Sequence, residues 1–459
     1  MSSDQKIIIV GAGLCGSLLA IRLGQRGYHV ELHEKRGDMR KEKMSAGRSI
    51  NLALSARGLL ALDRVGLKDE VLKQCIPMYG RMIHPIEGEP FLSPYSGREG
   101  EYINSVSRGG LNCLLLDEVE KLDNVTVHFN SECVQVDLES AHASFLSLES
   151  NEVAVAKGEV IIGTDGAGSA VRKAMMGRTT QLLFNYSQNF LRSGYKELSI
   201  LPKDGGGYKI VKHALHIWPR GKFMIIALPN MDGSFTVTMF HPYTGHAGFL
   251  TLDDEKNLTA FFEEYYPDLI PYIPHYIEEY NSNAVGTLGT IKCFPWQAFG
   301  KALVMGDAAH AIVPFYGQGM NASFEDVRVF DDILEDAGDE DWTMLFEKFQ
   351  QARAENTNAI ADLAIDNFIE MQDKVNDQAF IKKRKLEMEL EQNYPEYYSK
   401  YSLVTFKPDM PYRFAMDLGR AQDRILLDKC SRVENIAELD RDKIIKEIKE
   451  LHERMLDNK

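Results

Sequence analysis

The chain has 459 residues, of which 44% are hydrophobic and 26% charged, a globular composition that excludes extensive disorder. This length suits two or three packed domains better than a single core. The 52 basic and 67 acidic residues leave a net charge of −15, and nucleic acid is a poor partner because an acidic surface repels phosphate backbones.

The six cysteines contain no CxxC pair, and neighbouring cysteines are at least 20 residues apart. This spacing argues against a zinc knuckle or a redox dithiol and favours reduced thiols in a cytoplasmic protein. The early apolar run 7–21 is broken by glycines and lacks a basic leader, so we expect no signal peptide. No run of about 20 apolar residues predicts a transmembrane helix.

The first element is a short apolar run over residues 6–10, Lys-Ile-Ile-Ile-Val, which predicts a buried parallel strand. A glycine loop, Gly-Ala-Gly-Leu-Cys-Gly, follows at once over 11–16. A helix is predicted over 17–26 and a second strand over 29–33, closed by Glu34. Strand, glycine loop, helix, strand and acidic residue in this order predict a dinucleotide-binding unit.

Each residue of this unit has its own physical task. Gly11 permits the tight turn, Gly13 lets a pyrophosphate approach the backbone, and Gly16 lets the helix lie close to the strand. The helix start offers N–H groups and partial positive charge. Glu34 can accept hydrogen bonds from ribose hydroxyls and would repel a 2′-phosphate, which favours FAD or NAD over NADP. The alternative is a glycine-rich turn in some other α/β protein.

Further along the chain the pattern changes twice. The next expected elements are helices around 55–65 and over 111–122 and strands over 125–129, 160–163 and 302–305. Residues 181–285 alternate as strands, for instance 222–228 and 234–240, and predict an antiparallel sheet in a separate substrate domain. From about Ser323 onward the chain is mainly helical. Its segment from Ile444 to Met455 is amphipathic but highly charged, as in a surface or packing helix.

Three glycine–acid motifs stand in order along the chain: Gly11-x-Gly13-x-x-Gly16, Asp165-Gly166 and Gly306-Asp307. Together they resemble the group A flavoprotein monooxygenases, whose fold is p-hydroxybenzoate hydroxylase-like. In that family the aspartate of the third motif meets the ribityl chain or ribose of FAD, and Asp307 matches it. The Asp-Gly motif serves both FAD and NADPH, and Asp165 matches that aspartate.

Other segments resemble the kynurenine 3-monooxygenase family within this group, from Lys6 to about Arg420. They are 47–55, 81–84, 227–231, 313–322, 367–371 and 401–406. The last two lie outside the FAD-binding domain, so shared cofactor binding does not explain them. The resemblance implies hydroxylation of L-kynurenine to 3-hydroxykynurenine with tightly bound FAD, transient NADPH and O₂, through a flavin C4a-hydroperoxide.

The same resemblance places four residues at the positions that bind the substrate carboxylate: Arg81, Tyr95, Asn367 and Tyr401. A guanidinium pairs bidentately with a carboxylate, and phenols and an amide can orient it. Taken alone, each has a plainer interpretation, such as a surface ion pair, a turn aromatic or a solvent-bonded helix residue. Candidate walls of the substrate pocket are Leu215, Phe240, Phe315, Tyr316 and Met371, all equally compatible with core positions.

The resemblance also implies FAD contacts beyond the three motifs. These positions are Cys15, Lys35, Arg36, Arg40, Ala53, Arg108, Cys133, Gly319, Met320 and Asn321. The loop over 317–321 would present backbone N–H groups to the flavin pyrimidine carbonyls at a helix start. His310 is expected to be structural. No protein residue is assigned a catalytic role, because the aniline nitrogen already activates the ring, and no metal site is expected.

The implied fold class is α/β, with a Rossmann-type FAD-binding domain interleaved with an antiparallel sheet and followed by helices. The expected parts are 1–180 (with a substrate-side excursion about 75–104) and 286–335 for FAD, 181–285 for the sheet, and 336–459 for the helices. We expect a cytoplasmic monomer or homodimer without a membrane anchor. Two alternatives stay open: a hydroxylase of the same fold with another aromatic substrate, and a non-catalytic flavin-binding redox module.

Overall fold

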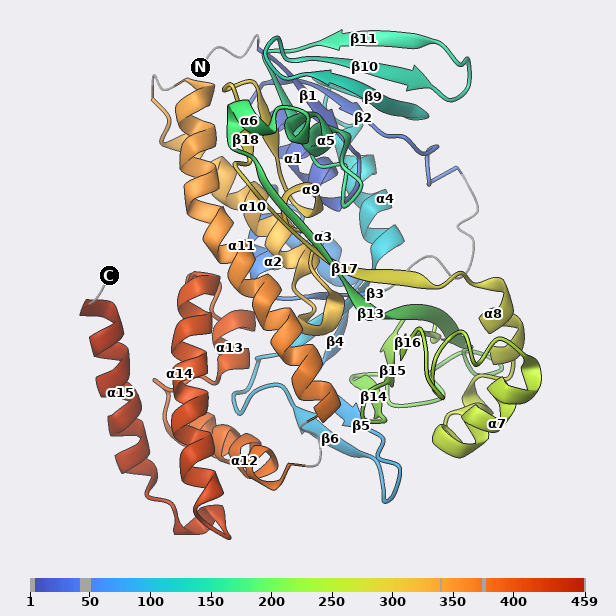
Figure 1. Ribbon diagram of the computed structural model, residues 1–459, viewed down its shortest axis with the longest axis vertical. Helices are drawn as coiled ribbons and strands as arrows, with labels where there is room; N and C mark the ends of the chain where they lie inside the picture. Colours follow the sequence, from blue (N-terminus) through green and yellow to red (C-terminus); the bar gives the residue numbers. More distant parts are fainter. Residues whose placement is uncertain (1–4, 42–50, 339–340, 374–376, 458–459) are drawn as a thin grey trace. The chain divides into compact units, whose positions relative to one another are not determined.

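The computed structural model of the protein describes residues 5–41, 51–338, 341–373 and 377–457. The chain forms two compact units, each assembled from three separate stretches (Figure 1). Unit 1 comprises Met1–Cys75, Val106–Leu191 and Leu288–Ala361, and unit 2 comprises Ile76–Ser105, Arg192–Thr287 and Asp362–Lys459. The helical region expected over 336–459 therefore contributes to both units, and the four-part division of the chain stays a prediction.

The core of unit 1 is a six-stranded sheet with the order β18-β19-β12-β1-β2-β8. Its strands are β1 (Lys6–Val10), β2 (His29–His33), β8 (Val125–His128), β12 (Val160–Gly163), β19 (Ala302–Val304) and β18 (Gln297–Ala298). All neighbours pair in parallel except β18 and β19. Ile7, Ile8 and Ile9 are fully buried, as expected of a parallel strand covered on both faces. The predicted strands of this sheet are confirmed.

Two helices of unit 1 begin three residues before their predicted starts. Helix α1 spans Leu14–Gln25, because Gly13 is extended and ends the preceding loop there. Helix α4 spans Arg108–Val119, because the Ser107 hydroxyl accepts a hydrogen bond from the Gly110 N–H and caps the helix. The apolar periodicity marked both helices but could not show where their caps lie.

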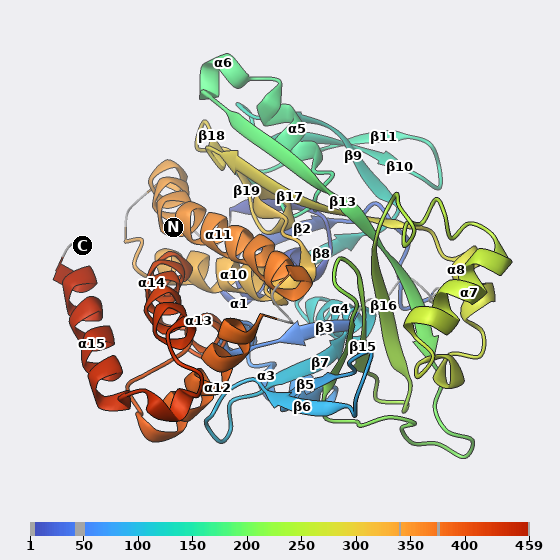
Figure 2. The same ribbon diagram turned by 60° about the horizontal axis from the view of Figure 1, so that its bottom comes forward.

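The remaining elements of unit 1 surround the sheet. The helices are α2 (Ala56–Arg64), α3 (Lys68–Lys73), α5 (Ala170–Met176), α6 (Thr179–Leu182), α9 (Asp307–His310), η2 (Pro314–Tyr316) and α10 (Gly319–Glu335). Four elements contribute residues to both units: helix α11 (Trp342–Asp373) and strands β7 (Ile103–Ser107), β13 (Asn185–Ile200) and β17 (Gly286–Phe294). Strand β3 spans Asn51–Leu54. An unpredicted antiparallel sheet joins β9 (Ser131–Asp137), β10 (His142–Ser147) and β11 (Val153–Lys157). These strands lie side by side in Figure 1 and Figure 2.

Most strands of the predicted substrate-side sheet belong to unit 2, and the sheet has the order β17-β13-β16-β15-β14-β5-β6. The strands are β16 (Phe235–Pro242), β15 (Met224–Pro229), β14 (Leu215–Pro219), β5 (Gly80–Ile83) and β6 (Phe91–Pro94), besides the end of β13. The strands within 181–285 pair antiparallel, as predicted, whereas the added strand β5 pairs with β14 in parallel. Strand β5 comes from the distant stretch 76–105, so no hairpin constrains its direction. A short pair, β4 (Ile76–Met78) with β7, precedes it.

The expectation that 181–285 is built of strands alone is wrong. Helices α7 (Glu255–Tyr265) and α8 (Tyr276–Ser282) and the 3-10 turn η1 (Ile270–Tyr272) lie within it. Asp254 caps α7 by accepting a hydrogen bond from the Asn257 N–H. Leu258, Phe261 and Phe262 have helical spacing and are buried in one cluster with strand residues of the sheet.

The C-terminal part of unit 2 is helical, as predicted. Its elements are α12 (Gln378–Asn393), α13 (Lys400–Thr405), α14 (Tyr412–Ser431), η3 (Ile436–Glu438) and α15 (Arg441–Asp457). Helix α14 contacts α12, α13 and α15 (Figure 2). The isoleucines Ile444, Ile445 and Ile448 of the charged helix α15 are buried in the cluster that α12 and α14 share. No helix in the described ranges is long and apolar enough to cross a membrane.

Candidate functional site

The glycine loop of unit 1 has the geometry that its three glycines predict. Gly11 has φ +100°, and a Cβ there would lie 2.7 Å from the Asp165 Cα. A Cβ on Gly16 would lie 2.0 Å from the Gly11 carbonyl oxygen and 2.4 Å from the Thr164 hydroxyl. A Cβ on Gly13 would meet nothing within 4 Å. Gly11 and Gly16 are therefore required by the protein, whereas the space beside Gly13 is open to a ligand.

The acidic end of β2 is joined to this loop. Glu34 is buried, and its carboxylate accepts hydrogen bonds from the Ala12 N–H at 2.9 Å and the Arg36 N–H at 3.0 Å. The Arg36 side chain adds an ion pair at 2.8 Å. The N-terminus of α1 has no side-chain cap. An uncapped helix start beside a fixed carboxylate suits a pyrophosphate followed by a ribose.

The second motif holds a carboxylate of which one oxygen accepts a hydrogen bond. Asp165 Oδ2 accepts a hydrogen bond from the Ala170 N–H at 2.6 Å. Its Oδ1 is buried and has no hydrogen-bond partner among the described residues. Burial raises the pKa of Asp165, against the lowering effect of Ser169 and the backbone N–H groups. A buried acceptor without a donor is costly, so a ligand hydroxyl at Oδ1 would relieve this cost.

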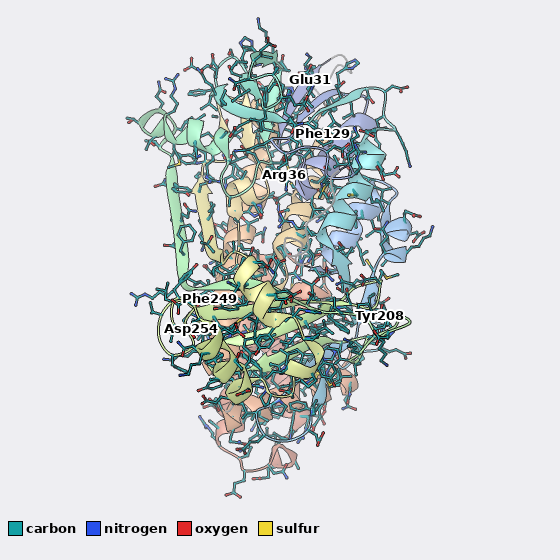
Figure 3. The ribbon with its side chains drawn as sticks, turned by 90° about the vertical axis from the view of Figure 1, so that its right-hand side faces the viewer. Glu31, Arg36, Phe129, Tyr208, Phe249 and Asp254 are labelled. Carbon is teal, nitrogen blue, oxygen red and sulfur yellow. The ribbon has the colours of Figure 1, made fainter. Side chains whose placement is uncertain are left out.

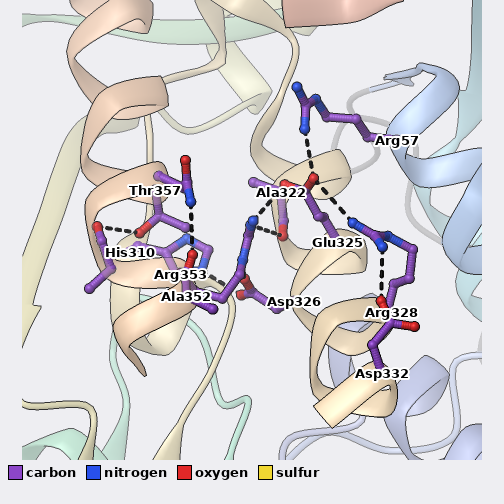
Figure 4. Close-up of polar contacts among 12 residues, drawn as sticks. Arg57, His310, Ala322, Glu325, Asp326, Arg328, Asp332, Ala352, Arg353 and Thr357 are labelled. Carbon is purple, nitrogen blue, oxygen red and sulfur yellow. Dashed lines mark hydrogen bonds and ion pairs between the residues drawn. The ribbon is translucent and has the colours of Figure 1, made fainter. Parts of the chain in front are cut away.

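The third motif sits on a network of buried charges drawn in Figure 4. Asp326 Oδ2 accepts hydrogen bonds from the Gly306 N–H at 3.0 Å and from His310 Nε2 at 2.5 Å, and Oδ1 accepts from Arg353 Nε at 2.7 Å. Burial alone would raise the pKa of Asp326, but the charges of His310 and Arg353 outweigh it and lower this pKa. The network holds the turn from which the exposed side chain of Asp307 projects.

The sequence did not indicate that buried charges hold the turn of Asp307, although His310 was expected to be structural. Glu325 joins the same network and pairs with Arg353 and Arg57, both at 2.6 Å (Figure 4). The two adjacent acids lie within α10 and gave no sign of burial in the sequence. The partners named above lie 16 to 268 positions away along the chain.

The loop before α10 also has defined anchors. Asn321 Nδ2 donates to the Ala53 carbonyl at 2.8 Å and to the Gly317 carbonyl at 2.9 Å. Asn321 Oδ1 accepts from the Ser55 N–H at 2.9 Å. Gly317 has φ +70°, which favours glycine, and no side chain caps α10. The side chain of Asn321 thus fixes the loop, while Gly319 and Met320 lie at an uncapped helix start.

The other predicted cofactor residues differ in whether their side chains could contact a ligand in this arrangement. The Cys15 thiol is buried and points to the Ser323 carbonyl, so only its backbone can meet a ligand. All five N–H groups of Arg40 donate to Asp38, Asp117 and Glu120, which leaves none for a phosphate in this arrangement. Lys35 pairs with Glu132 at 2.6 Å. Arg108 is exposed at the first turn of α4, and Cys133 lies on β9.

These features fit FAD. The open space at Gly13, the single unpaired oxygen of Asp165, the exposed Asp307 and the uncapped starts of α1 and α10 are all in unit 1. Sequence reasoning also missed Asn112, whose amide donates to the Ala12 carbonyl at 3.2 Å from beneath the glycine loop.

In unit 2, three of the four predicted substrate residues come together. The guanidinium of Arg81 on β5 lies 4.9 Å from the centre of the Tyr401 ring and 5.4 Å from that of Tyr95. The two rings are stacked, 5.4 Å apart and 12° from parallel. Arg81 is half-buried, and none of the described carboxylates lies within ion-pair distance of it. An arginine beside two stacked phenols, without an acidic partner among the described residues, is suited to a ligand carboxylate.

Of the two phenols, Tyr95 is buried and Tyr401 is half-buried. The Tyr95 side chain is 2% exposed, and its hydroxyl has no hydrogen-bond partner among the described residues. Burial raises the pKa of Tyr95 and also that of Tyr401, against the lowering effect of Arg81. Both phenols therefore stay protonated at neutral pH and can donate a hydrogen bond to an anion.

Glu391 of α12 connects the segments that carry the two tyrosines, and sequence reasoning missed it. Its buried carboxylate accepts hydrogen bonds from the Gly97 N–H at 3.0 Å and from the Ser399 N–H at 2.8 Å. The Arg98 guanidinium donates a hydrogen bond to the Tyr397 carbonyl and lies over the Tyr398 ring. The loop after Tyr95 and the N-terminus of α13, which carries Tyr401, are thus held by one carboxylate.

The remaining predicted substrate residues are less closely placed. Leu215 is the register partner of Arg81 on the neighbouring strand, and Phe240 is buried in β16 of the same sheet. Asn367 lies on α11 in unit 2, whereas Phe315 and Tyr316 belong to η2 of unit 1. The Met371 side chain and residues 47–50 of one family-like segment lie outside the described parts. A separate cavity of about 370 Å³ among the C-terminal helices is lined by none of the four carboxylate-binding candidates.

Comparisons with known proteins concern the family and the fold of the chain. The FAD binding domain family matches residues 4–183 and 292–356, more than half of the chain. The chain is 46% identical to a kynurenine 3-monooxygenase of Myxococcus xanthus, over 93% of this chain and 91% of the relative. It is 42% identical to that of Dictyostelium discoideum, over 92% of each, and 43% identical to that of Flavobacterium johnsoniae, over 95% and 96%.

Two solved structures resemble the whole fold. A tetrameric form of 2-methyl-3-hydroxypyridine-5-carboxylic acid oxygenase has a TM-score of 0.63 at 19% identity, covering 88% of this chain and 96% of that one. P. aeruginosa PqsL in complex with 2-aminobenzoylacetate has a TM-score of 0.66 at 17% identity, covering 81% and 97%. At such identities they speak for the fold alone, and the predicted fold class is confirmed.

Proposed function

The chain belongs to the kynurenine 3-monooxygenases, which hydroxylate L-kynurenine to 3-hydroxykynurenine with FAD, NADPH and O₂, and we propose that Arg81, Tyr95 and Tyr401 bind the substrate's carboxylate. The chain is accordingly a flavin-dependent aromatic monooxygenase. Asn367, on α11 in the same unit, is the fourth proposed contact.

One observation carries the assignment of the substrate site. Arg81 is half-buried against two aromatic rings, yet no carboxylate in the described part of the chain pairs with it. Guanidinium groups removed from bulk water are usually paired, because burying an unpaired charge is costly. L-kynurenine brings an α-carboxylate, whose two oxygens can accept two parallel hydrogen bonds from the Arg81 guanidinium.

The protonated phenols then complete the recognition. Tyr95 has a hydroxyl without a protein partner, so it can donate to the carboxylate without breaking an existing hydrogen bond. Tyr401 stacks on Tyr95 and shares the face of Arg81. Holding one end of the substrate in this way orients the aromatic ring and limits its motion, which is the main contribution the protein makes to the reaction.

The FAD assignments are proposals of the same kind. Gly13 and the start of α1 would hold the pyrophosphate, Glu34 the adenosine ribose, and Asp165 and Asp307 the hydroxyls of the ribose and ribityl chain. Bound FAD supplies the redox chemistry, taking electrons from NADPH and passing one oxygen atom of O₂ to the aromatic ring. Only one dinucleotide fingerprint is present, so NADPH is proposed to bind transiently in a groove.

The first experiment is NADPH oxidation by the FAD-loaded protein with and without L-kynurenine, with the product identified by mass spectrometry. We expect strong stimulation and a product heavier by one oxygen atom. Arg81→Ala should raise the KM for L-kynurenine more than a hundredfold, since two charged hydrogen bonds of about 1.5 kcal/mol or more each are lost. Arg81→Lys should be intermediate, because an ammonium cannot pair bidentately. Arg432→Ala, at an exposed ion pair of unit 2, is the matched control.

The two alternatives are separated by the same assay. Stimulation by a carboxylate-free aromatic amine equal to that by L-kynurenine would favour a hydroxylase of the same fold with another substrate. A yellow protein that oxidises NADPH at one rate whether or not substrate is added would favour a non-catalytic flavin module. Unchanged kinetics of Arg81→Ala would refute the carboxylate site while leaving the family intact.

We further propose that the protein works in the cytoplasm as a monomer or homodimer. All six cysteines are free thiols, which suits a reducing compartment. Light scattering of the FAD-loaded protein at micromolar concentration would measure the mass directly, and a larger assembly would overturn the proposed state.

A further inference from the structure

Three metal-ligating side chains meet on one face of the unit 1 sheet, away from the residues assigned above. Glu31 and His33 lie two residues apart on β2, so their side chains share a face. His128 is the register partner of His33 on the edge strand β8. One carboxylate oxygen and one nitrogen of each imidazole lie within 4.8 Å of one another. Glu31 is labelled on its strand in Figure 3.

His33 provides a second, independent observation. Its side chain is 7% exposed, and Nε2 is buried with no hydrogen-bond partner among the described residues. The other ring nitrogen, Nδ1, lies 2.9 Å from the Ser131 hydroxyl. With Nδ1–H donating to Ser131, Nε2 carries a lone pair directed at the cluster. Metal-binding histidines commonly have their other ring nitrogen held by such a second hydrogen bond.

The spacing of the ligand atoms is close to what a small cation requires. His33 Nε2 lies 3.9 Å from Glu31 Oε2, too far for a hydrogen bond. Ligands about 2.0–2.2 Å from a tetrahedral ion are separated by roughly 3.3–3.6 Å, so small side-chain rotations would complete the site. His33 itself is held in place by stacking between the rings of His128, at 4.5 Å, and Phe145, at 3.6 Å.

We propose that Glu31, His33 and His128 form a binding site for a divalent transition-metal cation, with Zn²⁺ the best-suited ion and water as the fourth ligand. Two imidazoles and one carboxylate with an open position are a ligand set that zinc accepts. The ion would join the edge strand β8 to β2, one residue before Glu34. It would act as a structural cross-link of the sheet, separate from the flavin chemistry.

One neighbouring charge opposes the ion. Lys6 on β1 pairs with Glu31 Oε1 at 2.7 Å, and its side chain is 44% exposed. Because this ammonium can swing into solvent, Glu31 can exchange it for a metal ion. The other described acidic cluster, Asp331 with Asp332 and Glu335, is already engaged by arginines and is no competitor.

The test uses the FAD-loaded protein, freed of metal by a chelator and then dialysed. Calorimetric titration with ZnCl₂ should show one ion per chain, and thermal unfolding at saturating Zn²⁺ should shift to higher temperature. Glu31→Gln and His128→Gln should each weaken binding more than tenfold, whereas Lys6→Gln should strengthen it. His142→Gln, on β10 and outside the cluster, is the matched control and should bind as the parent does.

Variants at half-buried Glu31 and exposed His128 are preferred to variants at buried His33, and their unfolding temperatures without metal should equal that of the parent. Absence of Zn²⁺ uptake at micromolar concentration would overturn the proposal. So would uptake that Glu31→Gln and His128→Gln leave unchanged, since the ion would then be bound elsewhere. Loss of binding in both variants with the control intact would support it, whatever their monooxygenase activity.

Discussion

Replacing Glu391 with glutamine tests whether one buried carboxylate holds the substrate-binding tyrosines together. Glu391 accepts the Gly97 N–H at 3.0 Å and the Ser399 N–H at 2.8 Å, one with each carboxylate oxygen. A glutamine keeps one acceptor and directs an NH₂ group at the other N–H. One charge-assisted hydrogen bond is lost and a buried donor is left facing another donor, at a cost of about 2–4 kcal/mol.

The loss should appear both in stability and in substrate binding. Urea unfolding of Glu391→Gln should give a free energy of unfolding about 2–4 kcal/mol below that of the parent. The KM for L-kynurenine should rise about tenfold, because the loop of Tyr95 and the helix of Tyr401 no longer share an anchor. FAD affinity should stay unchanged, since the proposed FAD contacts lie in unit 1.

The matched control is Glu389→Gln, two residues away on the same helix. Glu389 is exposed and pairs with Arg441 at 2.7 Å, a surface ion pair expected to contribute about 0–1 kcal/mol. If Glu391→Gln loses no more stability than Glu389→Gln, or if its KM is that of the parent, the carboxylate does not position the tyrosines. A stability loss without a change in KM would reduce Glu391 to a structural residue.

Three further predictions concern the two sites. Gly13→Ala should fold as stably as the parent but bind FAD more weakly in a fluorescence titration. Gly16→Ala should lower the unfolding temperature, because a Cβ on Gly16, unlike one on Gly13, would lie 2.0 Å from the backbone. Equal behaviour of the two variants would contradict the assigned roles. Tyr95→Phe should keep or slightly raise the free energy of unfolding, because it removes a buried hydroxyl without a hydrogen-bond partner among the described residues. The same variant should raise the KM for L-kynurenine. An unchanged KM would exclude the hydroxyl from substrate binding. Asp326→Asn should cost about 3–5 kcal/mol at pH 7. Since the folded pKa of Asp326 is lowered, its stabilisation is present above the unfolded value of about 3.9 and is lost as pH falls through the folded pKa. The difference in unfolding free energy between parent and Asp326→Asn should therefore shrink below about pH 4, and a pH-independent difference would refute the assigned charge.

Features that depend on neighbouring residues were predictable from the sequence. The strand of residues 6–10, the glycine loop and the strand that ends at Glu34 form a contiguous pattern, and their positions agree with β1, α1 and β2 to within three residues. The tasks of Gly11 and Gly16 follow from local backbone geometry, which short stretches of sequence specify. The amphipathic helix α7 was missed because its apolar spacing was hidden among strand-like segments.

The grouping of distant side chains was not predictable in this way. Family resemblance named Arg81, Tyr95 and Tyr401, but it did not name Glu391. This residue joins the segments of the two tyrosines through partners that are 294 and 8 residues away. Likewise Asp326 supports Gly306 from a helix, and His33 meets His128 across two strands. Local preferences act over a few residues, whereas these contacts exist only once strands and helices have packed. Packing therefore decides which polar atoms become buried without a hydrogen-bond partner among the described residues, such as Asp165 Oδ1 and His33 Nε2, and so where a ligand can bind.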